Sequence, residues 1–330
     1  MSSRGVPWQF AALALAWGSS FLFMKVGLAG LSPVQLVTAR MALGALALLV
    51  LVVVRRVPLP RSARALAHIG VVSLFLCVLP FLLFAWAGER INSGLSSIFN
   101  ATTPLMTLLI TLVALRAERP HRGQLAGLGL GLAGVLVVLA PWQLTGVTGG
   151  ITAQLACLAA TASYGLAFVY LRRFVSPLGL PAIAVATVQV GLGAVPLLAT
   201  VPFLDPHPVT LTPAVVLSVL GLGVFGTGLA YVWNTGIVAA WGAAVASSVT
   251  YLTPVIGVAL GAVVLGEAIT WNQPAGAVLV VAGIVLSRGA KGGSRPPAPA
   301  RTPAASTAGA TPTRPTVRRA DRAGAPARDR

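Results

Sequence analysis

The strongest constraint in this sequence is a succession of apolar segments of nearly equal length. Each is close to the ~20 residues that a helix needs to cross a bilayer core. In a chain of 330 residues they leave little to form a surface that faces water. They lie at residues 8–28, 34–54, 68–87, 91–115, 124–140, 151–171, 178–203, 213–236, 241–265 and 271–287. The sequence therefore predicts an all-α integral membrane protein with about ten transmembrane helices.

Charged residues are too few for a soluble protein. They make up 9% of the chain, whereas a soluble domain carries about 25%. The net charge of +17 does not indicate a nucleic-acid surface, because ten of the Lys and Arg residues lie from Arg288 onward, in a stretch without aromatic residues. Residues 289–330 are rich in Pro, Ala, Thr and Arg, and we expect a disordered basic cytoplasmic tail. Contact of this tail with anionic lipid is an alternative.

The positions of the cations predict an orientation, because cytoplasmic loops carry an excess of Lys and Arg. If residues 1–7 are cytoplasmic, the loops after the second, fourth and sixth segments lie on the same side and hold most of the loop cations. The external loops hold Arg90, and the stretch 141–150 holds neither Lys nor Arg. We therefore expect both termini in the cytoplasm and an external linker at residues 141–150.

The two halves of the chain repeat one pattern, in which an apolar segment with Ser, Thr and Pro precedes a charged corner and a second apolar segment. Pro104 and Pro254 lie 150 residues apart, and Glu118 and Glu267 lie 149 apart. Further matched pairs are Ser97 and Ser247, Thr103 and Thr253, Gln124 and Gln273, and Gly127 and Gly276. Five segments in each half give the halves opposite orientations, so we predict two inverted five-helix repeats at residues 8–140 and 151–288.

Polar residues follow one face of the fourth segment and of the ninth at helical spacing. They are Ser93, Ser96, Ser97, Asn100, Thr103, Thr107 and Thr111 in the fourth, and Ser247, Thr250 and Tyr251 in the ninth. One such stripe would indicate helix packing, but two at equivalent positions of inverted repeats favour a shared cavity at the midplane. Pro104 and Pro254 are predicted to break their helices and act as hinges, because proline removes a backbone donor.

Two cations lie inside apolar segments, where an ionisable group is costly unless it is paired or hydrated. Arg40 lies in the outer half of the second segment, and Lys25 lies nearer the outer end of the first. We predict that Arg40, together with Lys25, attracts a carboxylate or phosphate of a substrate. Snorkelling of Lys25 to the outer surface is the alternative. Glu89 and Arg90 are predicted to form a local ion pair at the outer mouth.

The residues that support catalysis or metal binding are not clustered. Cys77 and Cys157 fall in apolar segments and are interpreted as packing residues, and the three histidines lie far apart. We predict no metal site, no cofactor and no catalytic residue, which disfavours a membrane enzyme. Two G-x-G-x-x-G matches, at 129–134 and 221–226, lie inside apolar segments and indicate helix packing. The glycines expected on one packing face are Gly123, Gly127 and Gly131. No Asp or Glu lies within a segment, which favours facilitated export or exchange over proton coupling.

A set of residues spread over positions 8–287 is specific in its order and duplication. It comprises Trp17-Gly18-Ser19, Arg40, Pro104 with Glu118, Pro254 with Gly266-Glu267, and Gly127, Gly134, Gly276 and Gly283. In these residues the chain resembles the EamA-type members of the drug/metabolite transporter superfamily. The resemblance implies a multi-pass protein of a bacterial-type plasma (inner) membrane that exports amino acids or other small metabolites by alternating access through a central cavity.

The predicted substrate-binding residues combine the stripes, the cations and nearby aromatic residues. They are Trp17, Ser20, Lys25, Arg40, Trp86, Ser96, Asn100, Tyr164, Tyr231, Asn234, Ser247, Thr250 and Tyr251. For the aromatic residues, a place in the core or in an interfacial belt is an equal alternative. The expected partners are a small-molecule substrate and the lipid bilayer, with a homodimer left open. The alternative functions are transport of phosphorylated or nucleotide-linked sugars and translocation of a lipid-linked substrate.

Overall fold

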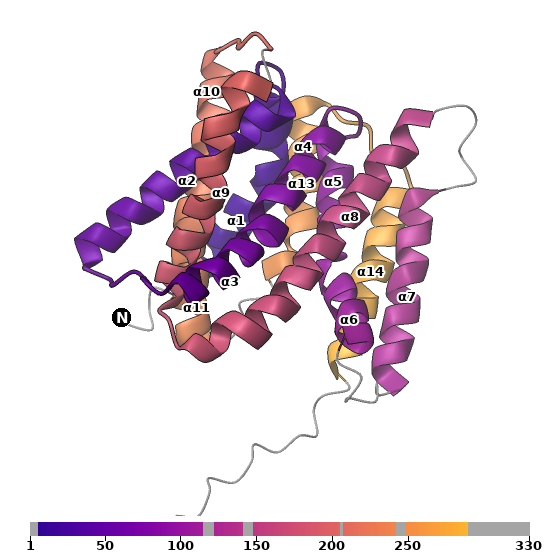
Figure 1. Cartoon of the computed structure of the whole chain (residues 1–330). Helices are drawn as coiled ribbons and strands as arrows, with labels where there is room; N and C mark the ends of the chain where they lie inside the picture. The colour runs from indigo at the N-terminus through magenta and orange to yellow at the C-terminus, as the bar shows by residue number, and fades with distance from the viewer. Residues whose placement is uncertain (1–5, 115–121, 141–147, 205–206, 242–248, 290–330) are drawn as a thin grey trace, which may run out of the picture. The chain divides into compact units, whose positions relative to one another are not determined.

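A computed structural model describes residues 6–114, 122–140, 148–204, 207–241 and 249–289 (Figure 1). All regular elements in these ranges are helices. Seven apolar helical segments among the described residues are long enough to cross a membrane, and three shorter apolar helices accompany them at Leu125–Leu139, Thr253–Leu265 and Asn272–Leu286. The described residues thus form an all-α membrane protein, as the sequence predicts. The predicted disordered tail, 289–330, lies almost wholly outside the described residues.

The first two helices are α1 (Val6–Gly27) and α2 (Pro33–Arg55). The start of α2 follows from its sequence, because Ser32 and Gln35 form a capping box with both hydrogen bonds at 3.1 Å. Proline at the first position of the helix fits there because its missing N–H would be unpaired in any case. These residues fix where α2 enters the bundle and therefore the depth of Arg40.

The third apolar segment, 68–87, contains Pro80, and a break is expected there because proline interrupts an α-helix, but the segment is continuous in the structure. It runs from α3 (Ala63–Ser73) through a π-helical segment, Leu74–Val78, into α4 (Leu79–Gly88). Proline cannot donate a backbone hydrogen bond and clashes with the preceding turn of an α-helix. The wider π-helical turn, in which the N–H of Leu79 donates to the carbonyl of Leu74, accommodates it and keeps the helix continuous.

The fourth segment is interrupted between α5 (Ser93–Asn100) and α6 (Thr103–Ala114), and Pro104 is the second residue of α6. In the second half, a short 3₁₀ turn at Val249–Tyr251 precedes α13 (Thr253–Leu265), where Pro254 stands in the first turn. The last helix of each half is α7 (Arg122–Leu139) or α14 (Asn272–Gly289). The hinge role of the two prolines stays a prediction.

The remaining helices belong to the second half of the chain. They are α8 (Thr148–Tyr170), with π-helical and 3₁₀ turns after it, α9 (Ala182–Leu204), α10 (Pro213–Leu220) and α11 (Ala230–Trp241). The longest of the three described π-helical segments, Gly221–Leu229, joins α10 to α11 without a break. It occupies the eighth apolar segment, as Leu74–Val78 occupies the third.

Helices far apart in the sequence pack in pairs. The helix α7 lies along α14, and α2 lies along α9 (Figure 1). The helices α4 and α6 pack on α8, and α1 packs on α10, α11 and α13. The core between them is built from large apolar side chains such as Phe84, Phe99 and Met41, each under 2% exposed.

Small residues bring α7 and α14 together, as the glycine spacing predicts. A Cβ added at Gly283 would lie 2.5 Å from the backbone nitrogen of Gly131 and 2.6 Å from the carbonyl oxygen of Gly127. A Cβ at Gly134 would lie 2.7 Å from the nitrogen of Val280. The packing role of Gly127 and Gly131 is therefore confirmed.

Gly134→Val is expected to lower the free energy of unfolding by about 1–3 kcal/mol, because the added side chain meets backbone atoms of α14 that cannot move aside cheaply. Gly129→Val is a matched control on the same helix, since a Cβ there would have no atom within 4 Å. Thermal unfolding of the purified protein in detergent measures both. Equal midpoints for the two variants would contradict this account of the helix pair.

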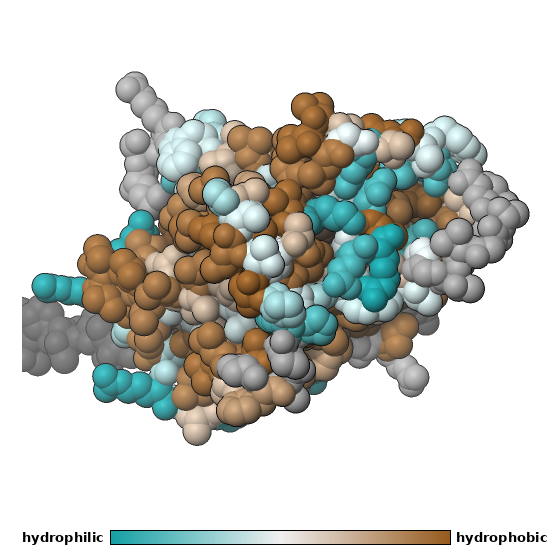
Figure 2. Space-filling view, turned by 90° about the horizontal axis from the view of Figure 1, so that it is seen from above, coloured by the Kyte–Doolittle hydropathy of each residue, from teal (hydrophilic) through white to brown (hydrophobic). Residues whose placement is uncertain are grey.

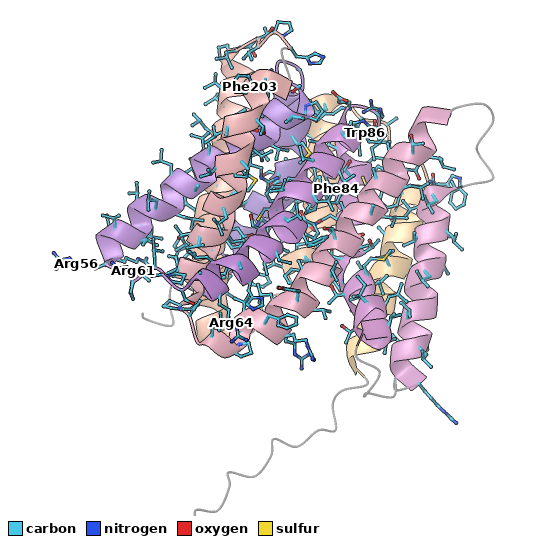
Figure 3. The ribbon with its side chains drawn as sticks, in the orientation of Figure 1. Arg56, Arg61, Arg64, Phe84, Trp86 and Phe203 are labelled. Carbon is cyan, nitrogen blue, oxygen red and sulfur yellow. The ribbon has the colours of Figure 1, made fainter. Side chains whose placement is uncertain are left out.

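The outer face of the bundle is apolar. Phe203 is 85% exposed and Val263 84%, which suits contact with lipid and not with water. Seen from above, apolar residues cover much of the surface, a cluster of hydrophilic residues lies to the right of centre, and a few others project at the left edge (Figure 2). Arg56, Arg61 and Arg64 lie toward one end of the bundle, and Trp86 and Phe203 toward the other (Figure 3).

Candidate functional site

Arg40 lies inside the bundle with 6% of its surface exposed. It is seven residues into α2, about 10 Å along the axis from the helix start. Its Nε donates a hydrogen bond to Thr227 Oγ1 at 3.1 Å, and its guanidinium carbon lies 3.8 Å from the centroid of the Phe81 ring. Within the described residues, its two terminal nitrogens make no hydrogen bond or ion pair. Arg40 is thus a positioned, buried cation without a described counter-ion.

The contact between Arg40 and Thr227 depends on a close approach of α2 to the π-helical segment Gly221–Leu229. A Cβ at Gly44 would lie 2.7 Å from Thr227 Cγ2, and a Cβ at Gly223 would lie 2.5 Å from Leu43 Cβ. The Thr227 hydroxyl donates to the carbonyl oxygen of Leu222 at 3.1 Å, which leaves a lone pair to accept from Arg40. The π-helical segment therefore holds the Thr227 hydroxyl in place, and this hydroxyl in turn orients the guanidinium of Arg40.

Gln189 on α9 is a second polar group in the interior that the sequence analysis missed. It is 2% exposed, and its Nε2 donates to Cys77 Sγ at 3.0 Å and to the Tyr231 hydroxyl at 3.3 Å. Tyr231, Cys77 and Tyr164 all lie close enough to Arg40 to interact with it electrostatically. A signal was present in the sequence, because Gln189 follows Arg40 by 149 residues, the offset that relates the two corner glutamates.

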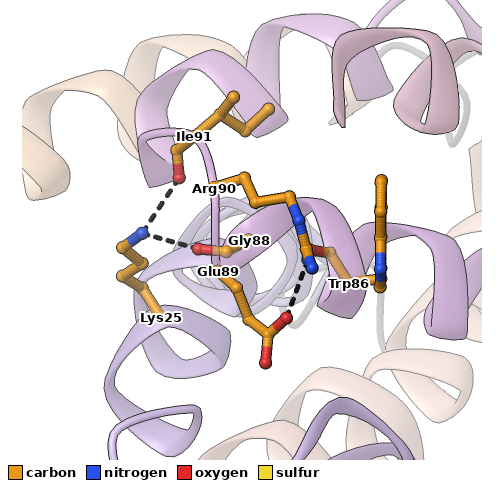
Figure 4. Close-up of polar contacts among 6 residues, drawn as sticks. All are labelled: Lys25, Trp86, Gly88, Glu89, Arg90 and Ile91. Atoms are coloured by element: carbon orange, nitrogen blue, oxygen red, sulfur yellow. Dashed lines mark hydrogen bonds and ion pairs between the residues drawn. The ribbon is translucent and has the colours of Figure 1, made fainter. Parts of the chain in front are cut away.

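The ammonium group of Lys25 donates its hydrogen bonds to backbone carbonyls at and just after the end of α4. Its Nζ donates to the carbonyl oxygens of Gly88 at 2.6 Å and Ile91 at 3.1 Å (Figure 4). A cation is favourable at a helix C-terminus, where carbonyl groups lack partners. No described contact joins Lys25 to Arg40, so the structure does not bring the two predicted cations together.

Trp86 lies at the rim of the bundle and is 36% exposed. The guanidinium carbon of Arg90 lies 3.9 Å from the centroid of its ring, and Arg90 also pairs with Glu89 at 2.8 Å (Figure 4). The predicted ion pair between Glu89 and Arg90 is therefore confirmed. Because both side chains are exposed, it contributes little to stability.

Most hydroxyls of the fourth segment donate hydrogen bonds to backbone carbonyls of the same segment. Ser97 Oγ donates to the carbonyl of Gly94 at 2.6 Å, and Thr103 Oγ1 donates to that of Asn100 at 2.7 Å. Ser20 does the same on α1, donating to Ala16 at 2.7 Å. The side-chain amides of Asn100 and Asn234 differ, because both residues are half-buried and no hydrogen bond of either amide is found among the described residues.

The other predicted residues have varied surroundings. Ser96 is buried next to the Cys157 thiol, and the Tyr164 ring packs against Phe84 with centroids 6.2 Å apart. Trp17 is half-buried against the apolar cluster around Leu13. Thr250 lies in the short turn before α13, and its carbonyl accepts from Thr253 Oγ1 at 2.9 Å. Ser247 and the side chain of Tyr251 lie outside the described residues. In the part of the chain that the structure describes, no three of His, Cys, Asp and Glu lie together in a way that could hold a metal ion.

Glu267 is a structural residue that the sequence pattern marks without giving its role. Its Oε1 accepts from the backbone N–H of Ser93 at 2.7 Å. Its Oε2 accepts from the Ser93 hydroxyl at 2.9 Å and from the N–H of Gly94 at 3.1 Å. A carboxylate from the loop after α13 thus caps the N-terminus of α5, where unpaired N–H groups favour an anion.

Comparison with known proteins gives consistent results. The model of the EamA-like transporter family matches residues 5–140 and again residues 151–289. The chain is 28% identical over 292 residues to a probable amino-acid metabolite efflux pump of Salmonella typhimurium, covering 83% of this chain and 92% of that protein. It is 26% identical to the uncharacterized transporter YdfC of Bacillus subtilis, covering 82% and 87%. A solved crystal structure superposes with a TM-score of 0.60 at 20% identity, over 87% of this chain and 97% of that one, which indicates a shared fold.

Proposed function

The chain belongs to the EamA-like transporter family, and from this premise we propose that it exports amino acids or other small metabolites across a plasma membrane. That it is a multi-pass membrane transporter follows from the family and from the apolar helices. Export is also the activity for which the Salmonella relative, a probable efflux pump, is named. The transport mode we propose is alternating access through a central cavity around Arg40.

The architecture we propose for this cycle is ten spans in two inverted five-helix repeats, with both termini cytoplasmic. The two matches of the family model support it. The pairing of α2 with α9 and of α7 with α14 also supports it, because each pair joins the corresponding helices of the two halves. Such repeats place the substrate site at their interface and exchange access by rocking against each other.

The observation that carries the proposal is the buried charge of Arg40, which has no counter-ion in the described ranges of the chain. A guanidinium at membrane depth is unfavourable without a partner, so an unpaired one is best explained by an anion that arrives with the substrate. Its planar fork matches a carboxylate, and the contacts with Thr227 and Phe81 hold that fork in place before the substrate binds.

Counterflow in proteoliposomes tests the proposal directly. The liposomes are loaded with amino acids, organic acids or phosphorylated sugars, and uptake of labelled compound is followed with and without a pH gradient. We expect exchange of small carboxylates that does not depend on the gradient, because no acidic residue lies within a predicted span. Exchange of phosphorylated sugars alone, or of no compound, would contradict the proposal.

A further inference from the structure

Among the described residues, the interior around Arg40 has a fixed cation and no anion to balance a second positive charge. The chain has six acidic residues. Of these, the structure describes Glu89, which pairs with Arg90, and Glu267, which caps α5. The other four are Glu118, Asp205, Asp321 and Asp329, at predicted segment ends or in the tail. Within the described part of the chain, a substrate ammonium group would therefore meet no carboxylate at the depth of Arg40.

Four backbone carbonyls at the irregular parts of the helices accept from hydroxyls of the chain itself. An ammonium group donates up to three hydrogen bonds and needs such acceptors when it is buried. At the π-helical segments Gly221–Leu229 and Leu74–Val78, Leu222 accepts from Thr227 Oγ1 at 3.1 Å and Phe75 accepts from Ser163 Oγ at 2.7 Å. At the breaks before α6 and α13, the carbonyls of Asn100 and Thr250 accept from threonine hydroxyls at 2.7 and 2.9 Å.

We propose that the transported species is a carboxylate monoanion without an ammonium group, such as a 2-hydroxy, 2-oxo or N-acylated acid, in preference to the zwitterionic amino acid with the same side chain. This inference rests on the proposed function, because it assigns the carboxylate to Arg40. Among the predicted substrate-binding residues that the structure describes, the available acceptors are neutral oxygens, on the amides of Asn100 and Asn234 and on the hydroxyls of Ser96, Tyr164 and Tyr231. Neutral oxygens suit a hydroxyl or an amide N–H, whereas an ammonium group would also be repelled by the guanidinium.

A single arginine likewise limits the substrate to one negative charge. One guanidinium forms a bidentate pair with one carboxylate, and Lys25, the other cation inside a span, already donates to the end of α4. A phosphate ester with two charges would keep one of them unpaired at this depth, which is unfavourable.

The test is competition in the counterflow assay with sets of compounds that share a side chain. Each set contains the amino acid, its N-acetyl derivative, its 2-hydroxy acid and its amide, for the side chains of phenylalanine, leucine and alanine. We expect the N-acetyl or hydroxy acid to compete at concentrations at least about tenfold lower than the zwitterion, because burying an unpaired ammonium is costly. Protein-free liposomes correct for passive leakage of the acids.

The outcomes separate the two proposals. If the zwitterion competes as well as its N-acetyl form and both lose exchange in Arg40→Gln, the carboxylate site stands and the exclusion of ammonium is overturned. If exchange of every compound is the same in Arg40→Gln as in the wild type, the proposed function fails as well.

A gain-of-acceptor variant provides a second test. Gln189→Glu places a carboxylate beside Tyr231 and is expected to reduce the preference for the N-acetyl acid about tenfold, because the ammonium group gains a charged acceptor. Gln35→Glu is the matched control for the added charge, since a glutamate there still accepts from the N–H of Ser32 in the capping box and loses the hydrogen bond that Gln35 Nε2 donates to the carbonyl oxygen of His207. An unchanged preference in a folded Gln189→Glu protein would overturn the inference.

Discussion

Arg40→Gln is expected to reduce exchange of carboxylate substrates about 100-fold, which corresponds to about 2.7 kcal/mol of lost binding, within the range for one partner of a buried charge pair. The loss should appear as weaker substrate affinity, because the guanidinium is proposed to hold the carboxylate. Thermal stability should stay the same or rise, because the variant removes a buried charge that has no described counter-ion. Counterflow at several substrate concentrations and thermal unfolding in detergent measure the two effects.

Two further variants separate charge from geometry at this position. Arg40→Lys keeps the charge but loses the planar fork and the stacking on Phe81, so its exchange should lie between the wild type and Arg40→Gln. Arg61→Gln removes an exposed cation from the loop after α2 and should leave exchange unchanged. Wild-type exchange in Arg40→Gln would remove the basis for the carboxylate site.

The structural class of the protein could be predicted from the sequence because a membrane permits so few kinds of backbone structure. Backbone groups in lipid must be paired internally, so apolar segments of this length become helices. The loop charges and the cap at Ser32 mark where such helices end, and the predicted second segment, 34–54, differs from α2 by one residue at each end. The buried position of Arg40 could be predicted as well, because a cation inside a long apolar segment can be recognised from the sequence alone.

The interruptions of the helices could be predicted only in part. Pro104 and Pro254 follow short non-helical stretches, but Pro80 is absorbed by a π-helical segment. Whether a proline breaks a helix depends on whether the preceding turn can widen, and the local sequence does not fix that. The polar stripe had a similar ambiguity, because a hydroxyl at helical spacing can face a cavity or donate to its own helix.

The contacts of Gln189 and Glu267 could be found only from the three-dimensional structure. Each is one polar residue in a sequence context that suggests nothing more than packing or a corner. The partners of Gln189 lie 112 and 42 residues away, and those of Glu267 lie 174 and 173 residues away. The repeat offset marked Glu267 and could have marked Gln189, but it does not say which groups either residue contacts.

Glu267→Ala is expected to lower the free energy of unfolding by about 2 kcal/mol, because it leaves two backbone N–H groups and a hydroxyl at the start of α5 without their acceptor. No other side chain caps the N-terminus of α5 in place of Glu267 among the described residues, since the side chain of Asn92 at the N-cap makes no capping hydrogen bond. Glu267→Gln should lose less, because its amide oxygen can still accept from one N–H. Thermal unfolding in detergent measures both variants.

Glu89→Gln is the matched control for this prediction, because Glu89 is the other acidic residue that the structure describes. Its pair with Arg90 is exposed, so its loss should cost less than about 1 kcal/mol. Glu267 differs because its carboxylate is enclosed between helices of the two halves: a Cβ at Gly261 of α13 would meet both Glu267 and Ser93. If Glu267→Ala and Glu89→Gln unfolded at the same temperature as the wild type, the contact between the loop after α13 and α5 would not stabilise the bundle.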